Sequence, residues 1–277
     1  MAKLISIIIP MFNEEGHIED CLQSLKKQSY KDLEIIVVDD GSADNSIEIA
    51  KKFDVKVLAQ NHKGPGTARN LGASHSKGDI LVFVDSDMTF ATNFIKDLTK
   101  PIILGHTIGT FSKNEFLANP NNIWALCWSI NRNWPKDRLI PKNSPDISPV
   151  FRAILKNEFN KVKGFDTTGE YTDDWSLSRK LNAKAISARG AVYYHSNPST
   201  LKEVTSQAKW FSTNMFISGN ILRKIKSLIS YSLPFSISIG FYKSIVNKTW
   251  QFVIFKLIFD TYVWISILKS FNRVMHN

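Results

Sequence analysis

Hydrophobic runs alternate with amphipathic stretches along the first hundred residues. Between the runs, apolar side chains recur at helical spacing from about His17 to Gln28, Ser46 to Phe53 and Ala68 to Ser76. Runs of Val and Ile without polar alternation are typical of strands buried on both faces. The order predicts β-α-β-α-β-α-β, an α/β fold with a mostly parallel, Rossmann-like sheet and flanking helices. The predicted strands read LISIIIP, LEIIVVDD, VKVLAQ and DILVFVDSD.

The pattern weakens beyond residue 100. Residues 112–148 are rich in Asn, Pro and Trp and indicate an irregular wall beside the sheet. Helices are expected near Lys156 to Val162 and from about Thr172 to Asn182, followed by a short strand, AVYYH. From about residue 200, serines, aromatics and scattered lysines replace the acidic turns.

We therefore expect two parts. Residues 1–200 form an α/β domain, whose two halves divide at about residue 100. Residues 201–277 form a basic, aromatic-rich tail of amphipathic helices.

Charge separates the same two parts. The chain of 277 residues has a net charge of +10, and residues 201–277 hold ten basic side chains and only two acidic ones. A basic balance favours nucleic acid, an anionic membrane surface or phosphorylated ligands as partners. The two cysteines, Cys21 and Cys127, allow one bridge at most, and no cleavable leader is recognised, so we expect a reducing cytosol.

Acidic residues follow two of the predicted strands. Asp39-Asp40 and Asp85-Ser86-Asp87 stand at the carboxyl ends, which is the edge where open α/β sheets bind ligands. Converging carboxylates suit Mg²⁺ or Mn²⁺ bound to a diphosphate. The alternative for each group is an ordinary turn, since aspartates also cap turns and helices.

A glycine-rich segment, GPGTARNLGA, follows the third strand. Gly64 and Gly66 permit close approach of the backbone to a ligand, and Arg69 offers a planar fork to phosphate or to a base. The segment lacks the Gly-Lys-Ser/Thr of a P-loop and the third glycine of GxGxxG, which disfavours ATP hydrolysis and nicotinamide binding.

In their order and spacing these segments resemble family 2 glycosyltransferases with the GT-A nucleotide-sugar-binding fold. The resemblance covers residues 4 to about 196. It implies that residues 1–200 form a catalytic domain, with a nucleotide-sugar half over about 1–100 and an acceptor half over about 101–200. The segments that carry the resemblance are SIIIPMFNEE, EIIVVDDGS, GPGTARNLGA, ILVFVDSD, KGFDTTGEYTDDWSLSRKL and AVYYH.

The resemblance implies a role for each matched residue. Asp174 corresponds to the general base of the acidic ED motif, although aspartate replaces the usual glutamate at Asp173. His195 ends the last strand and is expected near the metal or diphosphate, or is an ordinary strand-end histidine. The residues implied to bind the nucleotide sugar are Pro10, Phe12, Glu14, Asp39, Asp40, Arg69, Ser86 and Asp173, and those implied to bind metal are Asp85, Asp87 and His195.

The implied reaction is transfer of a sugar, as expected of a hexosyltransferase, by a single inverting displacement from a UDP- or GDP-sugar. The acceptor is a hydroxyl or a lipid phosphate, and a lipid-linked glycan is our hypothesis. Processive members carry Gln-x-x-Arg-Trp after the base, whereas here Ser206 takes the glutamine position and Lys209-Trp210 follows. This departure argues against a processive polymer synthase.

The tail allows three interpretations. Ser227 to Tyr242 is short for a spanning helix, and Thr249 to Leu268 is long enough but contains Lys256 and Asp260, which can pair at i, i+4. We expect an interfacial helix on the cytoplasmic face of a membrane; packing on the catalytic domain or in a homo-oligomer, and a true span, are the alternatives. The side chains that suit the interface are Phe252, Phe255, Phe259, Trp264, Lys248, Lys269 and Arg273.

Two other classes of function fit parts of the sequence. A nucleic-acid binder explains the positive charge, but no recognition module or dense arginine cluster is present, so nucleic acid is not expected as a partner. A non-catalytic nucleotide-sugar-binding or scaffold protein would keep the fold without needing the carboxylates. Asp85, Asp87 and Asp174 are all present, which favours the enzyme.

Overall fold

A computed structural model describes residues 3–167, 172–215 and 221–274. The chain divides into two compact units, each described by itself. One unit holds residues up to 116, 140–167 and 172–195, and the other holds 117–139 and 196–274.

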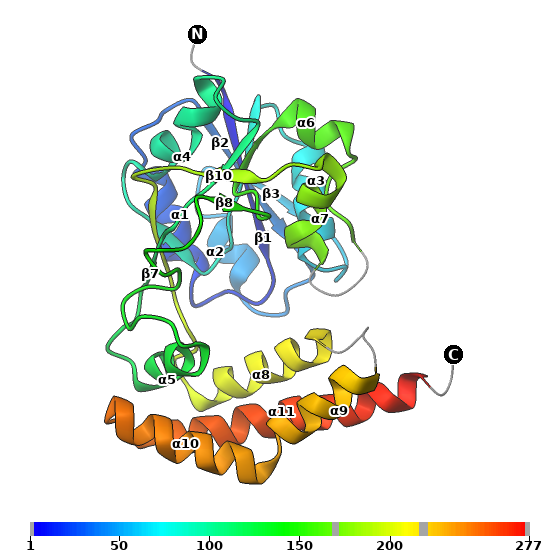
Figure 1. Ribbon diagram of the computed structural model, residues 1–277. Coiled ribbons are helices and arrows are strands. Elements are labelled where there is room, and N and C mark those ends of the chain that lie inside the picture. The colour runs from blue at the N-terminus through cyan, green and yellow to red at the C-terminus, as the bar shows by residue number, and fades with distance from the viewer. Residues whose placement is uncertain (1–2, 168–171, 216–220, 275–277) are drawn as a thin grey trace. The chain divides into compact units, whose positions relative to one another are not determined.

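An eight-stranded sheet organises the first unit (Figure 1), in the order β3-β2-β1-β4-β9-β6-β10-β8. The first four strands in this order pair in parallel, as expected, whereas β9 is antiparallel to both of its neighbours. Its strands are β1 (Ile5–Met11), β2 (Leu33–Asp39), β3 (Lys56–Ala59), β4 (Ile80–Phe83), β6 (Gly109–Phe111), β8 (Ile147–Ser148), β9 (Ala153–Leu155) and β10 (Ala185–Ser187).

A second sheet has three strands in the order β5-β11-β7, and its members are β5 (Met88–Phe90), β7 (Asn114–Leu117) and β11 (Val192–His195). Since β5 begins one residue after Asp87 and β11 ends at His195, this small sheet joins two of the expected site segments. The sequence pattern predicted β11 but neither of its partners.

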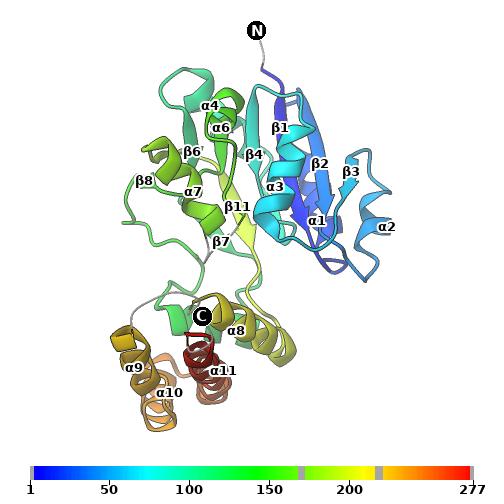
Figure 2. The same ribbon diagram turned by 90° about the vertical axis from the view of Figure 1, so that its right-hand side faces the viewer.

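Helices cover both faces of the large sheet (Figure 2) because side chains of successive strand residues point to opposite faces. In β1, Ile5, Ile7 and Ile9 pack with the side chains of one helical layer, whereas Ile8 packs with the other. The first layer contains α1 (Ile18–Lys26), α2 (Ser46–Ala50) and α4 (Phe94–Ile103), and the second contains α3 (Pro65–Ser74), α6 (Lys156–Lys161) and α7 (Thr172–Leu181).

One glycine fixes how closely α3 lies on β1. A Cβ added to Gly72 would come within 2.5 Å of Cγ2 of Ile8. The close approach holds α3, and Arg69 on it, near the carboxyl ends of the parallel strands.

The second unit is helical, and α11 is its core. Phe252, Phe255, Phe259, Val263 and Ile267 lie on one face of α11 and are buried against the other helices of the unit. Its helices are α5 (Ile123–Arg132), α8 (Leu201–Met215), α9 (Ile221–Ser230), α10 (Leu233–Asn247) and α11 (Gln251–Val274).

Two sequence expectations differ from this unit. Residues 112–148 are not irregular throughout: Asn122 caps α5 by accepting from the backbone N–H groups of Trp124 and Ala125, and Trp128 packs on Phe255 and Phe259. The three phenylalanines expected to face a membrane are buried instead, because a stripe at helical spacing meets α5 and α8. The i, i+4 pairing of Lys256 with Asp260 is confirmed, with Nζ and Oδ1 2.8 Å apart.

Within the described residues, α11 is the helix that meets the length and composition required of a membrane span, over Gln251–Phe271. A core helix of a protein that never enters a membrane meets the same requirement, and α11 has that position in its unit.

Candidate active site

The aspartates of the first strand-end group, at the end of β2, hold turns. The Asp39 carboxylate accepts from the backbone N–H groups of Gly41 (3.1 Å) and Ser42 (3.2 Å). The Asp40 carboxylate accepts from the backbone N–H groups of Lys63 (2.8 Å) and Gly64 (2.9 Å), just before α3 begins. Both side chains are buried, and these bonds are those of ordinary turns, the alternative role that the sequence allowed for Asp39 and Asp40.

An aromatic pair lies above Asp40. The rings of Phe12 and His62 have centroids 4.2 Å apart, and His62 Nδ1 is 3.0 Å from Oδ2 of Asp40. Phe12 is 42% exposed, whereas Pro10 is buried in β1. Of the expected nucleotide residues on β1 and the loop after it, Phe12 therefore presents a flat, accessible ring. His62 is a neighbour of the expected residues that the sequence did not reveal, since a lone histidine carries no motif.

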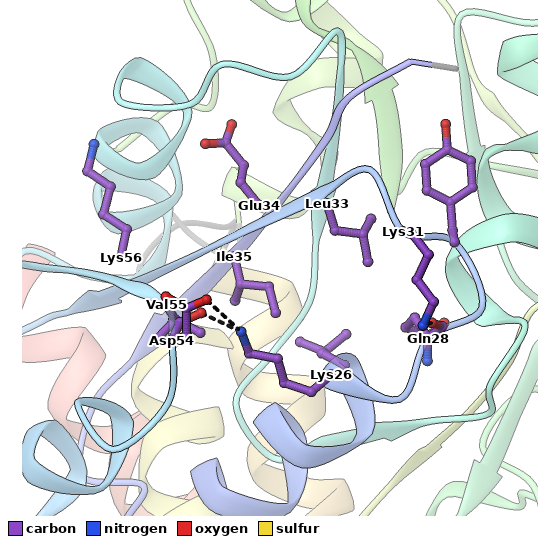
Figure 3. Close-up of a pocket in the computed structure, with 11 residues that line it drawn as sticks. Lys26, Gln28, Lys31, Leu33, Glu34, Ile35, Asp54, Val55 and Lys56 are labelled. Carbon is purple, nitrogen blue, oxygen red and sulfur yellow. Dashed lines mark hydrogen bonds and ion pairs between the residues drawn. The ribbon is translucent and has the colours of Figure 1, made fainter. Parts of the chain in front are cut away.

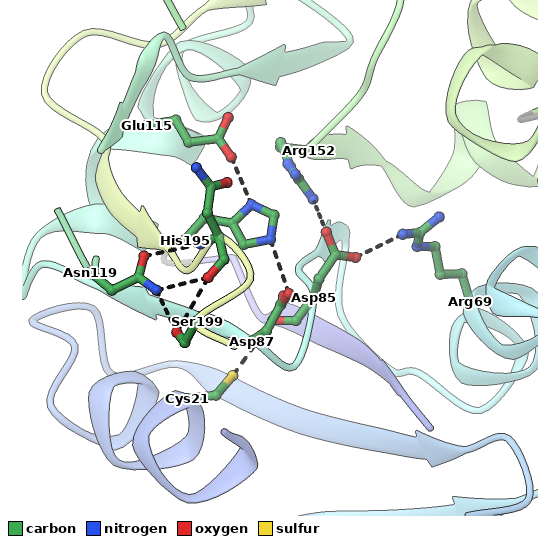
Figure 4. Close-up of polar contacts among 10 residues, drawn as sticks. Cys21, Arg69, Asp85, Asp87, Glu115, Asn119, Arg152, His195 and Ser199 are labelled. Atoms are coloured by element: carbon green, nitrogen blue, oxygen red, sulfur yellow. Dashed lines mark hydrogen bonds and ion pairs between the residues drawn. The ribbon is translucent and has the colours of Figure 1, made fainter. Parts of the chain in front are cut away.

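Two arginines hold the Asp85 carboxylate at the end of β4 (Figure 4). Nη2 of Arg69 lies 2.8 Å from Oδ1, and Nη1 of Arg152 lies 3.1 Å from Oδ2. Burial alone would raise the pKa of Asp85, but the charges of Arg152 and Arg69 outweigh it and hold this pKa well below its usual range. The ionised form of Asp85 is therefore favoured, and each of its oxygens already has a cationic partner.

Asp87 is linked to two half-buried side chains, His195 and Glu115. His195 at the end of β11 directs Nε2 at Oδ2 of Asp87 (3.0 Å) and Nδ1 at Oε1 of Glu115 on β7 (2.9 Å). Burial lowers the pKa of His195, but Asp87 and Glu115 together raise it well above its ordinary value. Both ring nitrogens thus face carboxylates, and Nε2 would bind a metal only after it loses its proton.

Glu14 shows that this edge of the sheet carries surplus negative charge. Burial, followed by the charges of Asp87 and Asp85, raises its pKa to about 8. A cation bound at this edge relieves such a surplus.

The donor atoms fit a divalent metal in part. The Asp87 carboxylate and the His195 imidazole face each other and are a donor pair that Mn²⁺ accepts. Of the three expected ligands, Asp85 differs because its oxygens contact arginines. Over the described ranges, no group of three or more His, Cys, Asp or Glu side chains is arranged to hold a metal ion.

The remaining expected residues are Ser86, Asp173 and Asp174. Ser86 is buried between the two aspartates of its motif. Asp173 and Asp174 belong to the first turn of α7, and their side chains lie outside the part of the chain that the structure describes.

Sequence reasoning missed Arg152 and Glu115, which contact the expected residues Asp85 and His195 directly. Arg152 immediately precedes β9, and Glu115 lies in the stretch expected to be irregular. Neither stands in a motif, and only the pairing of β9 with β4 and the small sheet bring them to the site.

A pocket of about 370 Å³ lies elsewhere, at the amino ends of β2 and β3 (Figure 3). Lys26 reaches across it to the backbone oxygen of Asp54 (2.5 Å) and to its carboxylate (3.7 Å). Because the aspartates of the site stand at the opposite, carboxyl ends of the strands, this pocket is separate from the candidate site.

Together, the sheet order and the carboxylates at its carboxyl edge define an α/β fold of the nucleotide-binding type. Comparison with known families makes this specific. The sequence model of Glycosyl transferase family 2 matches residues 6–162, more than half of the chain. The chain therefore belongs to glycosyltransferase family 2, and the resemblance inferred from its motifs is confirmed.

Curated relatives agree. The chain is 40% identical over 202 residues to the glycosyltransferase GlyG of Streptococcus pneumoniae, an overlap that covers 65% of each protein. It is 39% identical over 211 residues, 69% of this chain and 32% of the relative, to a poly(ribitol-phosphate) beta-glucosyltransferase of Bacillus spizizenii. The matches span less than two thirds of the length of these relatives.

Solved structures share the fold. S. aureus TarS in complex with UDP has a TM-score of 0.56 at 16% identity, with 97% of this chain and 91% of that chain covered. The mannosyltransferase PcManGT from Pyrobaculum calidifontis, in complex with GDP-Man and Mn²⁺, has a TM-score of 0.56 at 18% identity, covering 95% and 87%. The expected GT-A fold is confirmed.

Proposed function

We propose that the chain transfers a hexose from a nucleoside-diphosphate sugar to an acceptor hydroxyl or a lipid-linked phosphate, with inversion at the anomeric carbon. The observation that carries the proposal is the arrangement at the carboxyl edge, where arginine-bound Asp85 stands two residues before histidine-bound Asp87. The structural neighbours bound to UDP and to GDP-Man support a nucleotide-sugar donor.

The described residues have distinct parts in this proposal. The exposed Phe12 ring, paired with His62, offers a surface on which a base can stack. Arg69 and Arg152 provide cationic donors suited to a diphosphate, and in the structure both hold Asp85 in its ionised form. The nucleotide half of the site is thereby assigned to β1, α3 and the residues before β9.

Asp87 and His195 are the residues we propose to hold a divalent cation, Mn²⁺ or Mg²⁺. When bound, such a cation supplies positive charge to the leaving diphosphate. Glu115 holds the His195 ring by its other nitrogen, and such outer partners orient the side chains that bind a metal.

Asp174 is proposed as the general base that takes the proton of the acceptor hydroxyl as the new bond to the anomeric carbon forms. This role comes from the family resemblance. An ordinary aspartate has a pKa of about 3.9 and is a weak base for an alcohol, so its contribution requires proton transfer concerted with bond formation.

The proposed setting is the cytoplasmic side of a membrane, with the basic helical unit in contact with the surface. The excess of positive side chains over residues 201–277 supports it. A lipid-linked acceptor fits this setting.

A thermal-shift panel tests the donor class. UDP, GDP, CDP and ADP are compared, each with Mn²⁺, and the nucleotide that is bound raises the melting temperature by mass action. At a concentration about 100 times its Kd, a ligand adds about 2.7 kcal/mol, which is a shift of several degrees. Sugar release from the matching donor then separates an enzyme from a non-catalytic binding protein. No shift with any nucleotide contradicts the proposal.

A further inference from the structure

Large apolar side chains cover the outward face of two helices in the helical unit. On α10, Ile245 is 76% exposed, and on α9, Leu222 is 73% exposed. The exposed set also includes Ile225, Phe241 and Tyr242.

The side chains that these helices bury fully are small or polar, and Leu228 of α9 packs against the core of the unit as a partly buried residue. Ser236, Gly240 and Ser244 follow at i, i+4 and i+8 on α10 and are buried, and the closest atom to a Cβ added at Gly240 is the Cα of Val253 on α11, at 3.4 Å. Figures 1 and 2 both show α10 alongside α11. On α9 the buried side chain is Lys224, whose Nζ donates to the backbone oxygen of Ser270 (3.2 Å).

This arrangement reverses the polarity of an ordinary surface helix, which buries its apolar stripe and exposes its polar one. Small residues between helices and large apolar residues outside are typical of helices that contact lipid. The core of the unit is supplied by α11, so the apolar faces of α9 and α10 are not needed to build it.

Charge identifies the chemistry of the occupant. Residues 204–259 contain seven Lys or Arg and no Asp or Glu. Arg223 and Lys226 on α9, and Lys248 at the end of α10, are exposed beside the apolar residues. Apolar side chains flanked by cations alone match the boundary between acyl chains and anionic headgroups.

We propose that α9 and α10 are the membrane-binding surface of this protein, lying in the headgroup region of an anionic bilayer with their apolar faces toward the acyl chains. The helices have 10 and 15 residues and are shorter than the roughly 20 needed to cross it. The surface thus lies on α9 and α10, whereas the phenylalanine stripe of α11 is internal. The inference rests on the proposed function only for the idea of a membrane-associated acceptor.

Vesicle flotation tests the surface directly. The full chain is mixed with vesicles of phosphatidylcholine alone or with phosphatidylglycerol, and the Leu222→Gln/Ile245→Gln variant is compared with wild type. Each substitution removes apolar surface worth several methylene groups, so we expect at least tenfold weaker binding to anionic vesicles. The matched control is Leu104→Gln after α4, since Leu104 is 56% exposed but belongs to the other unit. It should float as wild type does.

Other outcomes overturn the inference. Equal flotation of the variant and wild type, or loss on Leu104→Gln alone, places the contact elsewhere. A wild type that ignores vesicles but forms dimers that the double substitution dissolves makes α9 and α10 a subunit interface. Resistance of bound protein to an alkaline carbonate wash makes the chain integral rather than interfacial.

Failure of this inference is distinguishable from failure of the transferase proposal. The melting temperature of the double variant and its shift with nucleotide and Mn²⁺ are measured without lipid. Both should equal those of wild type, because neither substitution lies in the unit that carries the site.

Discussion

Asp85 and Asp87 stand two residues apart, yet their surroundings give them different properties. Asp85 contacts two guanidinium groups, whereas Asp87 contacts an imidazole fixed from behind by Glu115. The first carboxylate is held in its ionised form by permanent charges. The second is paired with a side chain that can also bind a metal, which is why we assign the cation to Asp87 and His195.

The proposed general base, Asp174, can be tested by replacing its carboxylate with an amide. We expect Asp174→Asn to lower turnover at least a hundredfold while donor binding stays within about twofold, because an amide cannot accept the proton but leaves the nucleotide contacts intact. Turnover and nucleotide thermal shift are measured on the same preparation. Asp54→Asn, at the opposite edge of the sheet and fully exposed, is the control. A variant that keeps more than a few per cent of activity excludes Asp174 as the base.

Glu115 is a positioning residue, since it acts through His195. Glu115→Leu removes the acceptor for Nδ1, and loss of such a partner costs about 10- to 100-fold in metal affinity or activity. We expect the Mn²⁺ concentration for half-maximal turnover to rise by that factor. Glu115→Gln keeps an acceptor oxygen and should recover most of the loss. If both variants respond to Mn²⁺ as wild type does, Glu115 has no part in holding the ring.

At the scale of elements, the contact between α10 and α11 encloses a charge pair. The Asp260 carboxylate accepts hydrogen bonds from Nζ of Lys256 (2.8 Å) and from the hydroxyl of Ser236 (2.6 Å), and all three side chains are buried. Burial raises the pKa of Asp260 in spite of the lysine. A carboxyl group whose pKa is raised in the folded protein contributes most to the free energy of unfolding when it is protonated, at low pH.

Removing the lysine should therefore produce a stability loss that depends on pH. Lys256→Met leaves Asp260 without its counter-charge and is expected to cost about 3–5 kcal/mol when the carboxylate is ionised. The loss should be smaller at pH 5 than at pH 8, because the folded protein more readily keeps the proton as pH falls. Urea denaturation at both pH values measures it, with exposed Lys226→Met as the control. An equal loss at both pH values contradicts the assignment.

Elements also differ in how far their sequences predict them. The hydrophobic patterns of β1, α1 and β2 are strong because these elements bury most of their apolar side chains in the core. Their predicted positions agree with the structure within a few residues. Helix α10 consists almost entirely of apolar and small residues, so its pattern does not say which face turns inward. Packing against α11 decides this, through the close approach at Gly240.

At the scale of the whole molecule, metal dependence is the property with the broadest consequence. If Asp87 and His195 hold a cation required for departure of the diphosphate, EDTA should abolish turnover, and added Mn²⁺ or Mg²⁺ should restore it. Turnover is measured after dialysis, with back-titration of each metal. Full activity in excess EDTA contradicts the metal-dependent mechanism and leaves the cationic arginines as the remaining source of positive charge.

The net charge is also a property of the whole molecule. The net charge of +10 alone is equally compatible with nucleic acid, membrane or phosphorylated ligands. Division of the chain into two compact units places the excess on the helical one. The catalytic part over residues 1–200 stays a prediction. By packing, residues 117–139 belong to the helical unit.

By itself, the sequence determined the succession of strands and helices over the first hundred residues, the acidic groups that follow two of the strands and the family, because these depend on local hydrophobic pattern and contiguous motifs. Only the tertiary structure decided the partners of those groups. Arg152 and Glu115 reach Asp85 and His195 across separations of 67 and 80 residues. It also decided that the aromatic stripe of α11 is internal whereas α9 and α10 expose their large apolar side chains. A helical pattern defines the faces of a helix, and only packing decides which face turns inward.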